Sequence, residues 1–497
     1  MSGTDPRVMA VMMDPGFHPE SSAATELIQT HISYIFLVGD LVYKVKKPVD
    51  FGFLDFTTLE KRRDYCLEEL RLNRRLAADT YLCVRPLVET GSGALKWGDA
   101  VTRDSGGGNR DTVIEWVLIM RRLPEERMLK RLLSVGAVGL DTMEAIARKV
   151  ARFHADADTG GEINRIGGVD SIRHNNTENF EQTERYAGVT IPKPMFRFIR
   201  LYDATFFTRH LGLLEDRVHR GRVRDCHGDL HLEHVCLAGG DDGITIFDCI
   251  EFNRRFRYSD VACEVAFLYM DLDFNGYSEL AEHFVDAYVA ASGDSEVREL
   301  LNFFACYRAY VRGKVISFRL DDAGISQADR DEAALVARQS FELAFRYAAR
   351  FERPSLVMVG GLMGTGKSTL AAAMAGPLQA EVIRTDVVRK RLAGVPEDER
   401  HHDAFGAGLY SSEMTERTYK AALTEATRLL QAGRSVIVEA SWSRRRYRER
   451  AVAAAKEGGG AAVGHGPGAA GAVYLGECVC PEEGVQRRLE ARVAGTG

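Results

Sequence analysis

Residues 361–368 read Gly-Leu-Met-Gly-Thr-Gly-Lys-Ser, which fits the pattern G-x-x-x-x-G-K-[ST] of a phosphate-binding loop. An apolar, strand-like stretch at 355–359 precedes this loop, and a helix-forming stretch at 369–375 follows it. Glycines let backbone N–H groups curl around phosphate oxygens, and the N-terminus of the helix adds the positive end of its dipole. The sequence therefore predicts a nucleoside triphosphate site near the C-terminus.

The residue types in this loop indicate how a triphosphate would be held. Lys367 would reach the β- and γ-phosphates, and the hydroxyl of Ser368 would hold Mg²⁺. The residues expected to contact ATP here are Gly361, Gly364, Thr365, Gly366, Lys367, Ser368 and Thr369.

A second group of candidate catalytic residues lies in the middle of the chain. Residues 226–237 read Cys-His-Gly-Asp-Leu-His-Leu-Glu-His-Val-Cys-Leu, and an apolar strand starting at residue 244 ends in Asp248. Phosphoryl transfer to a hydroxyl uses one carboxylate to accept the proton and another to hold a metal ion on the triphosphate. Asp229 and Asp248 could take these two parts, although each could also be a turn-forming or capping residue.

This second group resembles the aminoglycoside/choline phosphotransferase family of kinase-like folds, whose catalytic loop is H-G-D-x-x-x-x-N. The resemblance implies that Asp229 is the catalytic base and that Asp248 is the metal ligand. It also implies that Lys44 grips the α/β-phosphates and that Glu69 pairs with this lysine. Lys46 on the same strand face is the alternative to Lys44, and a solvated strand edge is the other interpretation of this lysine-rich run.

One position departs from the family pattern. The asparagine of the family's loop falls on His234, and an asparagine offers a carbonyl oxygen, whereas imidazole is a poor ligand for Mg²⁺. His234 would therefore act through water, or the metal would bind more weakly. Asp260 resembles a structural aspartate that is common after the metal site.

The C-terminal part resembles the small-molecule P-loop kinases of the chloramphenicol phosphotransferase, polynucleotide kinase and zeta-toxin group. The resemblance implies that Asp386 is a base, with Arg389 in the helix that follows. Glu439 takes the place of the usual Walker B aspartate and would reach Mg²⁺ through water, and Arg488 would lie in a lid helix over the triphosphate. The alternatives are a helix cap for Asp386, an inert strand end for Glu439 and a solvated face for Arg488.

The order of expected elements divides the chain in two. Thr57-Thr58-Leu59-Glu60 has the spacing of a capping box and would open a helix to about residue 78. In the first part we expect a hairpin at 32–47, a strand at 113–120, and helices at 141–155, 177–187, 195–219, 260–290, 297–319 and 328–350. From 353 onward strands and helices alternate, which is typical of a parallel sheet, with strands at 355–359, 380–384, 435–439 and 472–476 and helices at 367–375, 387–393, 411–432, 443–456 and 482–494.

The predicted fold class is accordingly α+β and α/β, with two domains. Residues 1–352 would form a bilobal protein-kinase-like domain, and residues 353–497 would form a P-loop NTPase domain with a parallel sheet. The pairing resembles bacterial proteins described as bifunctional aminoglycoside phosphotransferase/ATP-binding proteins.

Composition excludes few function classes. The 497 residues carry a net charge of −6, which gives no indication of nucleic-acid binding. None of the nine cysteines forms a C-x-x-C pair, so neither a zinc site nor a disulfide framework is indicated, and a reducing cytoplasm fits. No apolar run reaches the ~18–20 residues of a membrane span.

These patterns favour an ATP- and Mg²⁺-dependent phosphotransferase with two nucleotide sites and a small-molecule hydroxyl as acceptor. One alternative is a single active P-loop kinase with a degenerate, regulatory N-terminal domain, which His234 favours. Another is a nucleotide-dependent binding switch. The sequence identifies neither the acceptor nor the oligomeric state. An acidic pocket for a cationic acceptor could come from residues whose helical spacing favours a solvated face instead: Asp271, Asp273, Glu279 and Glu282.

Overall fold

The computed structural model divides the chain into two compact units, Met1–Ala344 (unit 1) and Phe345–Gly497 (unit 2). The residues that it describes are 4–19, 24–102, 112–240, 242–322, 324–350, 354–396, 408–458 and 473–477. The boundary expected from the sequence, between 352 and 353, lies a few residues beyond this division and stays a prediction. No helix in the described ranges is long and apolar enough to cross a lipid bilayer.

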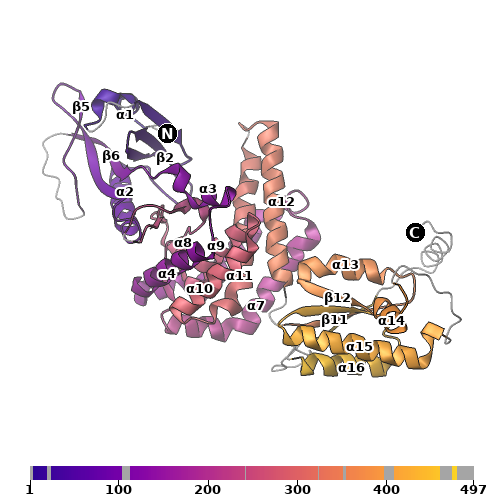
Figure 1. Ribbon diagram of the computed structural model, residues 1–497. Helices are drawn as coiled ribbons and strands as arrows, with labels where there is room; N and C mark the ends of the chain where they lie inside the picture. The colour runs from indigo at the N-terminus through magenta and orange to yellow at the C-terminus, as the bar shows by residue number, and fades with distance from the viewer. Residues whose placement is uncertain are drawn as a thin grey trace. The chain divides into compact units, whose positions relative to one another are not determined.

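The N-terminal part of unit 1 contains an antiparallel sheet, drawn in indigo and purple in Figure 1. Its strands, in spatial order, are β1 (Thr25–Gln29), β2 (Ser33–Val38), β3 (Leu41–Lys46), β6 (Thr112–Arg121), β4 (Tyr81–Glu89) and β5 (Leu95–Trp97). The predicted hairpin is confirmed, because β2 and β3 pair up to Val38 and Leu41 across a two-residue turn. Gly39 in this turn has a φ of 56°, a left-handed conformation that glycine adopts without strain.

A helix covers each face of this sheet. On one face, Val8 and Met12 of α1 (Pro6–Met13) pack against Tyr43 and Val45 of β3. On the other face, α2 (Leu59–Asn73) buries Cys66, Leu67 and Leu70 against β4 and β6. Since side chains alternate along a strand, Lys44 and Lys46 of β3 point to the face that α2 covers.

The start of α2 was predicted correctly, but its end was not. Thr58 is the N-cap, and its hydroxyl accepts a hydrogen bond from the N–H of Lys61. The helix ends at Asn73 rather than near residue 78. Beyond it, the Arg74 and Arg75 side chains donate to the backbone oxygens of Tyr81 and Asp225.

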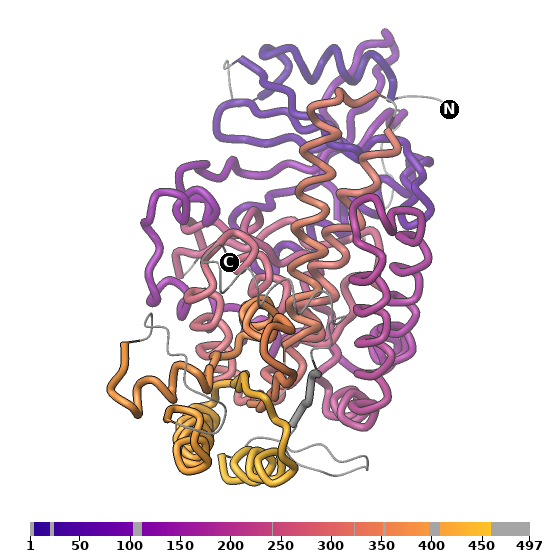
Figure 2. Tube along the Cα trace, turned by 90° about the vertical axis from the view of Figure 1, so that its right-hand side faces the viewer, coloured from indigo at the N-terminus to yellow at the C-terminus, as the bar shows by residue number. Residues whose placement is uncertain are grey.

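The rest of unit 1 is mainly helical, and in Figure 2 the indigo strands lead into its magenta and coral helices. α10 packs against α4 and α9, and α11 packs against α9. The helices are α3 (Leu129–Ser134), α4 (Leu140–Asp156), α5 (Gly161–Gly167), α6 (Val169–Thr183), α7 (Lys193–His219), α8 (Arg254–Arg257), α9 (Val261–Phe274), α10 (Ser278–Ser292), α11 (Val297–Phe318) and α12 (Gln327–Ala349). The 177–187 helix prediction was displaced, since α6 begins at Val169, and 260–290 is two helices rather than one.

Short strands between these helices position the loops that matter for chemistry. β7 (Val223–Asp225) pairs with β10 (Tyr258–Asp260), and β8 (Val235–Cys236) pairs with β9 (Thr245–Ile246). Single turns of 3₁₀ helix also occur, namely η1 (Pro15–Phe17), η2 (Glu125–Arg127), η3 (Glu184–Tyr186), η4 (Leu232–His234), η5 (Arg319–Asp321) and, in unit 2, η6 (Gly408–Tyr410).

Unit 2 contains the predicted parallel sheet, which confirms the expected fold class. The described strands lie in the order β12 (Ala380–Arg384), β13 (Ser435–Glu439), β11 (Leu356–Gly360) and β14 (Val473–Glu477). α13 (Lys367–Leu378) covers one face, and α15 (Ser412–Gln431) and α16 (Arg445–Glu457) cover the other, as Figure 1 shows. α14 (Thr385–Ala393) follows β12 directly. The helix expected at 482–494 lies outside the described residues.

Candidate functional site

In unit 1, β3 and α2 bring Lys44 and Glu69 together beside a residue from a distant loop. The Lys44 Nζ atom donates to Glu69 Oε1 at 2.7 Å and to Asp248 Oδ1 at 3.0 Å. Glu69 is fully buried. Burial alone would raise the pKa of the Glu69 carboxyl, but the charges of Lys44 and Lys46 hold it below its ordinary value. The three residues that the sequence analysis assigned to a nucleotide and metal site therefore lie in contact.

Lys46, which the sequence left as an alternative to Lys44, contacts a different set of carboxylate oxygens. Its Nζ atom donates to Glu69 Oε2 at 2.6 Å and also contacts Glu251 Oε1. Burial opposes the charge of Lys46, but Glu251 and Glu69 raise the pKa of its ammonium group. Glu251 was missed in the sequence, where its only signal is its position three residues after Asp248. The result is a chain of five alternating charges, in the order Asp248, Lys44, Glu69, Lys46 and Glu251, called here the charge ladder.

A buried glutamate binds the backbone of the loop that carries Asp229. Glu264 of α9 accepts hydrogen bonds from the N–H groups of His227 (3.1 Å) and Gly228 (2.5 Å). Gly228 has a φ of 88°, and a Cβ atom there would lie 3.1 Å from the Phe256 carbonyl oxygen, so only glycine fits without strain. These contacts hold the backbone directly before Asp229 in place.

The carboxylate of Asp229 lies among histidines. Its Oδ2 atom is 3.5 Å from His231 Nε2 and 3.5 Å from His234 Nδ1. Burial alone would raise the pKa of Asp229, but the hydrogen bond from His231 and the charge of His234 lower the pKa to about 2. Asp229 is therefore ionised throughout the physiological pH range and can only accept hydrogen bonds.

Asp248 lies at the end of the segment that follows β9, with an unusual backbone. Its φ is 63°, in the left-handed region, which aspartate tolerates better than most residues. The Asp248 N–H donates to the Tyr81 hydroxyl at 3.1 Å, and the next N–H, of Cys249, donates to Asn73 Oδ1 at 2.8 Å. Burial opposes ionisation, but Lys44 and then His234 lower the pKa of the Asp248 carboxyl. β4 and α2 thus fix the loop that presents this carboxylate.

His234 closes the loop that begins at Asp229. Its Nδ1 atom is 2.9 Å from the backbone oxygen of Asp229, and its Nε2 atom is 3.5 Å from Asp248 Oδ2. The histidine therefore lies where the resemblance places an asparagine, next to the expected metal ligand. Since imidazole is a poor ligand for Mg²⁺, this donor set does not fit Mg²⁺ well.

Two acidic residues outside the loop belong to the buried structure; the solvated face expected for Asp271 was wrong, and the structural part expected for Asp260 agrees with its contacts. Asp271 is not on a solvated face, because it is buried and its Oδ2 atom accepts a hydrogen bond from the N–H of Leu232, in the loop that carries Asp229. Asp260 has a structural place, since both of its carboxylate oxygens bind the buried Arg217 and it caps α9.

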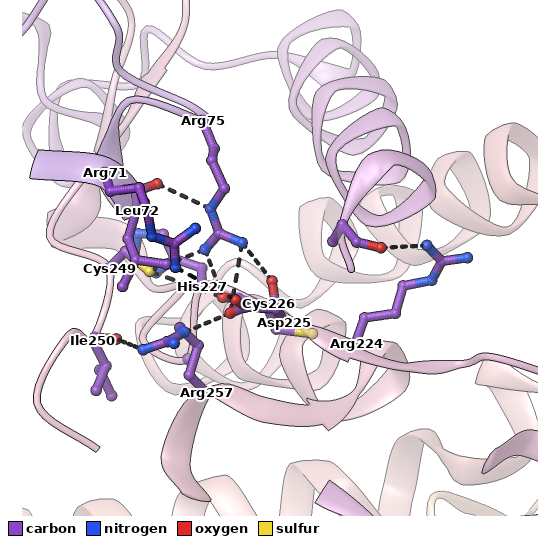
Figure 3. Close-up of polar contacts among 12 residues, drawn as sticks. Arg71, Leu72, Arg75, Arg224, Asp225, Cys226, His227, Cys249, Ile250 and Arg257 are labelled. Carbon is purple, nitrogen blue, oxygen red and sulfur yellow. Dashed lines mark hydrogen bonds and ion pairs between the residues drawn. The ribbon is translucent and has the colours of Figure 1, made fainter. Parts of the chain in front are cut away.

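Arginines tie the loop to α2, as the close-up in Figure 3 shows. Arg75 donates to the backbone oxygens of Asp225 (2.7 Å) and Cys226 (3.0 Å). Arg257 pairs with the Asp225 carboxylate at 2.5 Å and donates to the backbone oxygen of Ile250 at 2.7 Å. The strand before Asp229 and the segment after Asp248 are thereby held by the same group of arginines and by the C-terminal end of α2.

In unit 2, the predicted phosphate-binding loop connects β11 to α13. Its three glycines have positive φ values, namely 139° at Gly361, 82° at Gly364 and 96° at Gly366. Lys367 is the first residue of α13, and its Nζ atom donates to the backbone oxygen of Leu362 at 2.6 Å. Thr365 lies in the loop, and Thr369 lies exposed in the first turn of α13. The loop therefore has the strand–loop–helix context on which the sequence interpretation depends.

The carboxylate at the end of β13 reaches this loop. Glu439 Oε1 accepts a hydrogen bond from the Ser368 hydroxyl at 2.9 Å, and Glu439 Oε2 accepts one from Arg384 Nε at 3.2 Å. A hydroxyl and a carboxylate are hard oxygen donors, which fit Mg²⁺. The structure thus brings the two predicted metal-binding residues of unit 2 together.

The remaining predicted residues of unit 2 are less closely associated. Asp386 lies exposed in the first turn of α14, 4.0 Å from Lys390, and the N-cap position belongs to Arg384, so the capping alternative for Asp386 is wrong. Arg389 donates to the backbone oxygen of Leu409 rather than to Asp386. Arg488 lies outside the described residues.

Comparisons with known proteins match the C-terminal part of the chain to a family model and most of the chain to mycobacterial relatives. A family model described as an AAA domain matches residues 356–497. The Mycobacterium tuberculosis protein named "Uncharacterized protein Rv2004c" is 33% identical over 414 residues, which cover 83% of this chain and 78% of that protein. The Mycobacterium bovis protein named "Uncharacterized protein Mb2027c" gives the same values.

Solved structures match each part with low scores. A choline/ethanolamine kinase family protein from Mesorhizobium loti matches 68% of this chain and 99% of its own, with 10% identity and a TM-score of 0.38. The amicoumacin kinase hAmiN, solved with AMP-PNP, Ca²⁺ and Ami, matches 67% of this chain and 92% of its own, with 13% identity and a TM-score of 0.40. A gluconokinase from Sinorhizobium meliloti matches 28% of this chain and 66% of its own, with 20% identity and a TM-score of 0.18.

Proposed function

The chain belongs to the family of the mycobacterial protein Rv2004c, and we propose that it is an ATP-dependent phosphotransferase with one nucleotide site in each unit and a small-molecule hydroxyl as acceptor. The observation that carries the proposal is the contact of Lys44 with Asp248, 204 residues further along the chain. Asp248 in turn faces the loop of Asp229. A base, a metal-binding carboxylate and a phosphate-binding lysine in one place are the parts that phosphoryl transfer needs.

In unit 1, Lys44 would bind the α/β-phosphates, with Glu69 holding its ammonium group in place. Asp229 would accept a hydrogen bond from the acceptor hydroxyl and orient it for attack. Because its pKa is about 2, Asp229 is a weak base, and it takes up the proton only as the hydroxyl loses it. Bound ATP would supply the phosphoryl group. We propose no step through Mg²⁺ here, because the donors do not fit that ion.

In unit 2, backbone N–H groups of the loop and Lys367 would bind the β- and γ-phosphates. Ser368 and Glu439 would hold Mg²⁺, which would neutralise charge on the triphosphate. Asp386 would be the base and Arg488 a lid residue; both roles come from the resemblance to P-loop kinases. We also propose the domain boundary between 352 and 353 that the sequence indicates.

A second candidate function is a single active P-loop kinase with a regulatory unit 1. The observation that favours it is His234 at the position where the resembling enzymes carry asparagine. In that case unit 1 would bind nucleotide without transferring phosphate.

Labelled products distinguish these functions. Full-length protein would be incubated with γ-labelled ATP and a small-metabolite extract, as wild type, Asp229→Asn and Lys367→Ala. A product lost only in Asp229→Asn belongs to unit 1, and one lost only in Lys367→Ala belongs to unit 2. Asp216→Asn, at an exposed position of α7, is the matched control for the first substitution. The proposal requires at least two products, one lost only in Asp229→Asn and one lost only in Lys367→Ala. A single product, lost only in Lys367→Ala, supports the second candidate.

A further inference from the structure

The hydrogen bonds of His234 determine which of its ring nitrogens carries a proton. Nδ1 lies 2.9 Å from the backbone oxygen of Asp229. A carbonyl oxygen can only accept a hydrogen bond, so Nδ1 must be the donor. In the neutral imidazole the other nitrogen, Nε2, then carries a lone pair.

That lone pair faces a carboxylate. Nε2 of His234 is 3.5 Å from Oδ2 of Asp248. Two acceptor atoms at this distance repel one another unless a cation lies between them, either a second ring proton, which gives the ion pair that lowers the pKa of Asp248, or a metal ion. The other oxygen of Asp248, Oδ1, already accepts a hydrogen bond from Lys44 at 3.0 Å, which leaves Oδ2 available.

The distance also fits two ligands of one metal ion. Imidazole nitrogen and carboxylate oxygen bind first-row divalent metals at about 2.0–2.2 Å, so two such atoms on one ion lie roughly 3–3.5 Å apart. Histidine ligands of metals usually donate their other ring N–H to a carbonyl or carboxylate, which fixes the ring, and the Asp229 carbonyl does this for His234. The Asp248 side chain is 41% exposed, so water or phosphate oxygens can complete the coordination.

We propose that unit 1 contains a site selective for a divalent transition metal over Mg²⁺, with His234 Nε2 and Asp248 Oδ2 as its protein ligands. Mg²⁺ prefers oxygen donors in octahedral geometry, whereas imidazole suits later transition metals such as Fe²⁺, Co²⁺ and Zn²⁺. The inference rests on the proposed function only in assigning this ion to the triphosphate of the unit 1 site. The histidine at the asparagine position is then a change of metal and not a loss of the site.

Neighbouring donor groups fit a metal less well. Asp229, His231 and His234 also bring donor atoms within 4.8 Å of one another, but the Nδ1 atom that His234 turns toward Asp229 is used by the backbone. The buried group of His154, Cys226 and Glu264 is occupied, because Glu264 accepts hydrogen bonds from two backbone N–H groups and contacts His154.

Cobalt binding tests the site without any enzymatic assay. Full-length, untagged protein carrying Lys367→Ala, which weakens phosphate binding in unit 2, would be titrated with Co²⁺ while its visible absorption is recorded. We expect one Co²⁺ per chain with a ligand-field band. Since changes around a metal ligand alone typically cost 10–100-fold in affinity, loss of the ligand in His234→Asn should cost at least about tenfold. His174→Asn, at an exposed position of α6, is the matched control and should bind Co²⁺ as the parent does.

A parent protein without a stoichiometric ligand-field band would overturn the proposal, and so would a His234→Asn variant with unchanged affinity and spectrum. Asp248→Asn is a second ligand variant that should also lose Co²⁺, so the test holds even if His234→Asn does not fold. AMP-PNP binding to the same protein, measured with Co²⁺ and with Mg²⁺, separates this proposal from the proposed function. Tighter binding with Co²⁺, reversed in His234→Asn, supports the metal site, and equal binding contradicts it. Co²⁺ binding without any AMP-PNP binding contradicts only the nucleotide function of unit 1.

Discussion

Lys44 of unit 1 and Lys367 of unit 2 have the same proposed task, binding phosphate oxygens, but their surroundings differ. Lys44 lies in the charge ladder, between Glu69 and Asp248, and its side chain is 13% exposed. Lys367 lies at the start of a helix, where its ammonium group contacts a backbone oxygen of its own loop. The first lysine is held by residues from distant parts of the sequence, and the second by backbone geometry within a single motif.

Because of this difference, we expect loss of a lysine to lower the stability of the fold in unit 1 and the affinity for the ligand in unit 2. In the charge ladder, removal of one charge leaves another buried without a partner, which destabilises a fold strongly. In the phosphate-binding loop, the conformation comes from glycines with positive φ, so removal of the lysine should affect the ligand and leave the fold intact.

The largest expected effect is on the stability of unit 1. Lys46 is 1% exposed, and Lys46→Met would leave Glu251 and one oxygen of Glu69 buried without their cation. We expect a loss of about 3–5 kcal/mol in the free energy of unfolding. Denaturant titration, with hydrogen–deuterium exchange of β3 and α2 peptides, measures it. Lys44→Met is the matched control and should cost less, because its partner Asp248 is partly exposed. Equal, small losses in both variants would show that the ladder does not stabilise the fold.

We also expect an acid-dependent loss of stability in unit 1. Burial opposes ionisation of Glu264, but its hydrogen bond with His154 lowers its pKa to about 2, against about 4.3 in an unfolded chain. A lowered pKa contributes stability that is present above pH 4.3 and is lost as the pH falls toward 2. The shift corresponds to about 3 kcal/mol. Exchange protection of peptides 223–236 should fall over this range. Glu264→Gln should reduce the pH dependence and leave the part contributed by Asp229, whose pKa is also about 2. A pH profile that Glu264→Gln leaves unchanged would contradict this assignment.

In unit 2 the expected effect is on affinity. Lys367→Ala should weaken nucleotide binding by roughly 10–100-fold, since a hydrogen bond to a charged group contributes about 1.5–3 kcal/mol. The unfolding transition of unit 2 should not change. Isothermal titration with AMP-PNP measures the first quantity, and Lys420→Ala, at an exposed position of α15, is the control. If Lys367→Ala lowered the stability of unit 2, the proposed difference between Lys367 and Lys44 would be wrong.

The smallest expected effect concerns the ion pair beside the phosphate-binding loop. Arg384 is 46% exposed and pairs with Glu439 at 3.2 Å. Exposed ion pairs contribute roughly 0.2–1 kcal/mol, so Arg384→Met should change the stability of unit 2 by no more than this. Thermal unfolding at low and high salt measures it. A loss of several kcal/mol would place this pair in the same class as the charge ladder.

Features encoded within a short stretch of sequence could be predicted. The phosphate-binding loop follows from eight consecutive residues, the hairpin from a two-residue turn between alternating strands, and the start of α2 from Thr58. The parallel sheet of unit 2 follows from alternating strands and helices. In each case the physical cause of the structure, whether turn, cap or glycine backbone, lies within a few residues of its effect.

Features that depend on contacts between distant segments could not be predicted from the residues alone. Glu251 and Glu264 were not singled out, because their roles arise from contacts with Lys46 and with the N–H groups of residues 227 and 228. Asp271 has the helical spacing of a surface residue, yet the loop that carries Asp229 covers it. The position of Lys44 relative to Asp248 was available only through the family resemblance, since nothing local relates residues 204 positions apart.

The stoichiometry of nucleotide binding tests most directly the claim that each unit has its own nucleotide site. AMP-PNP binding to the full-length protein would be measured by equilibrium dialysis with Mg²⁺ and Co²⁺ both present. We predict two nucleotides per chain for the wild type, one for Lys44→Met, one for Lys367→Ala and none at the same concentration for the double variant. One nucleotide per chain in the wild type, unaffected by Lys44→Met and lost in Lys367→Ala, would contradict the account.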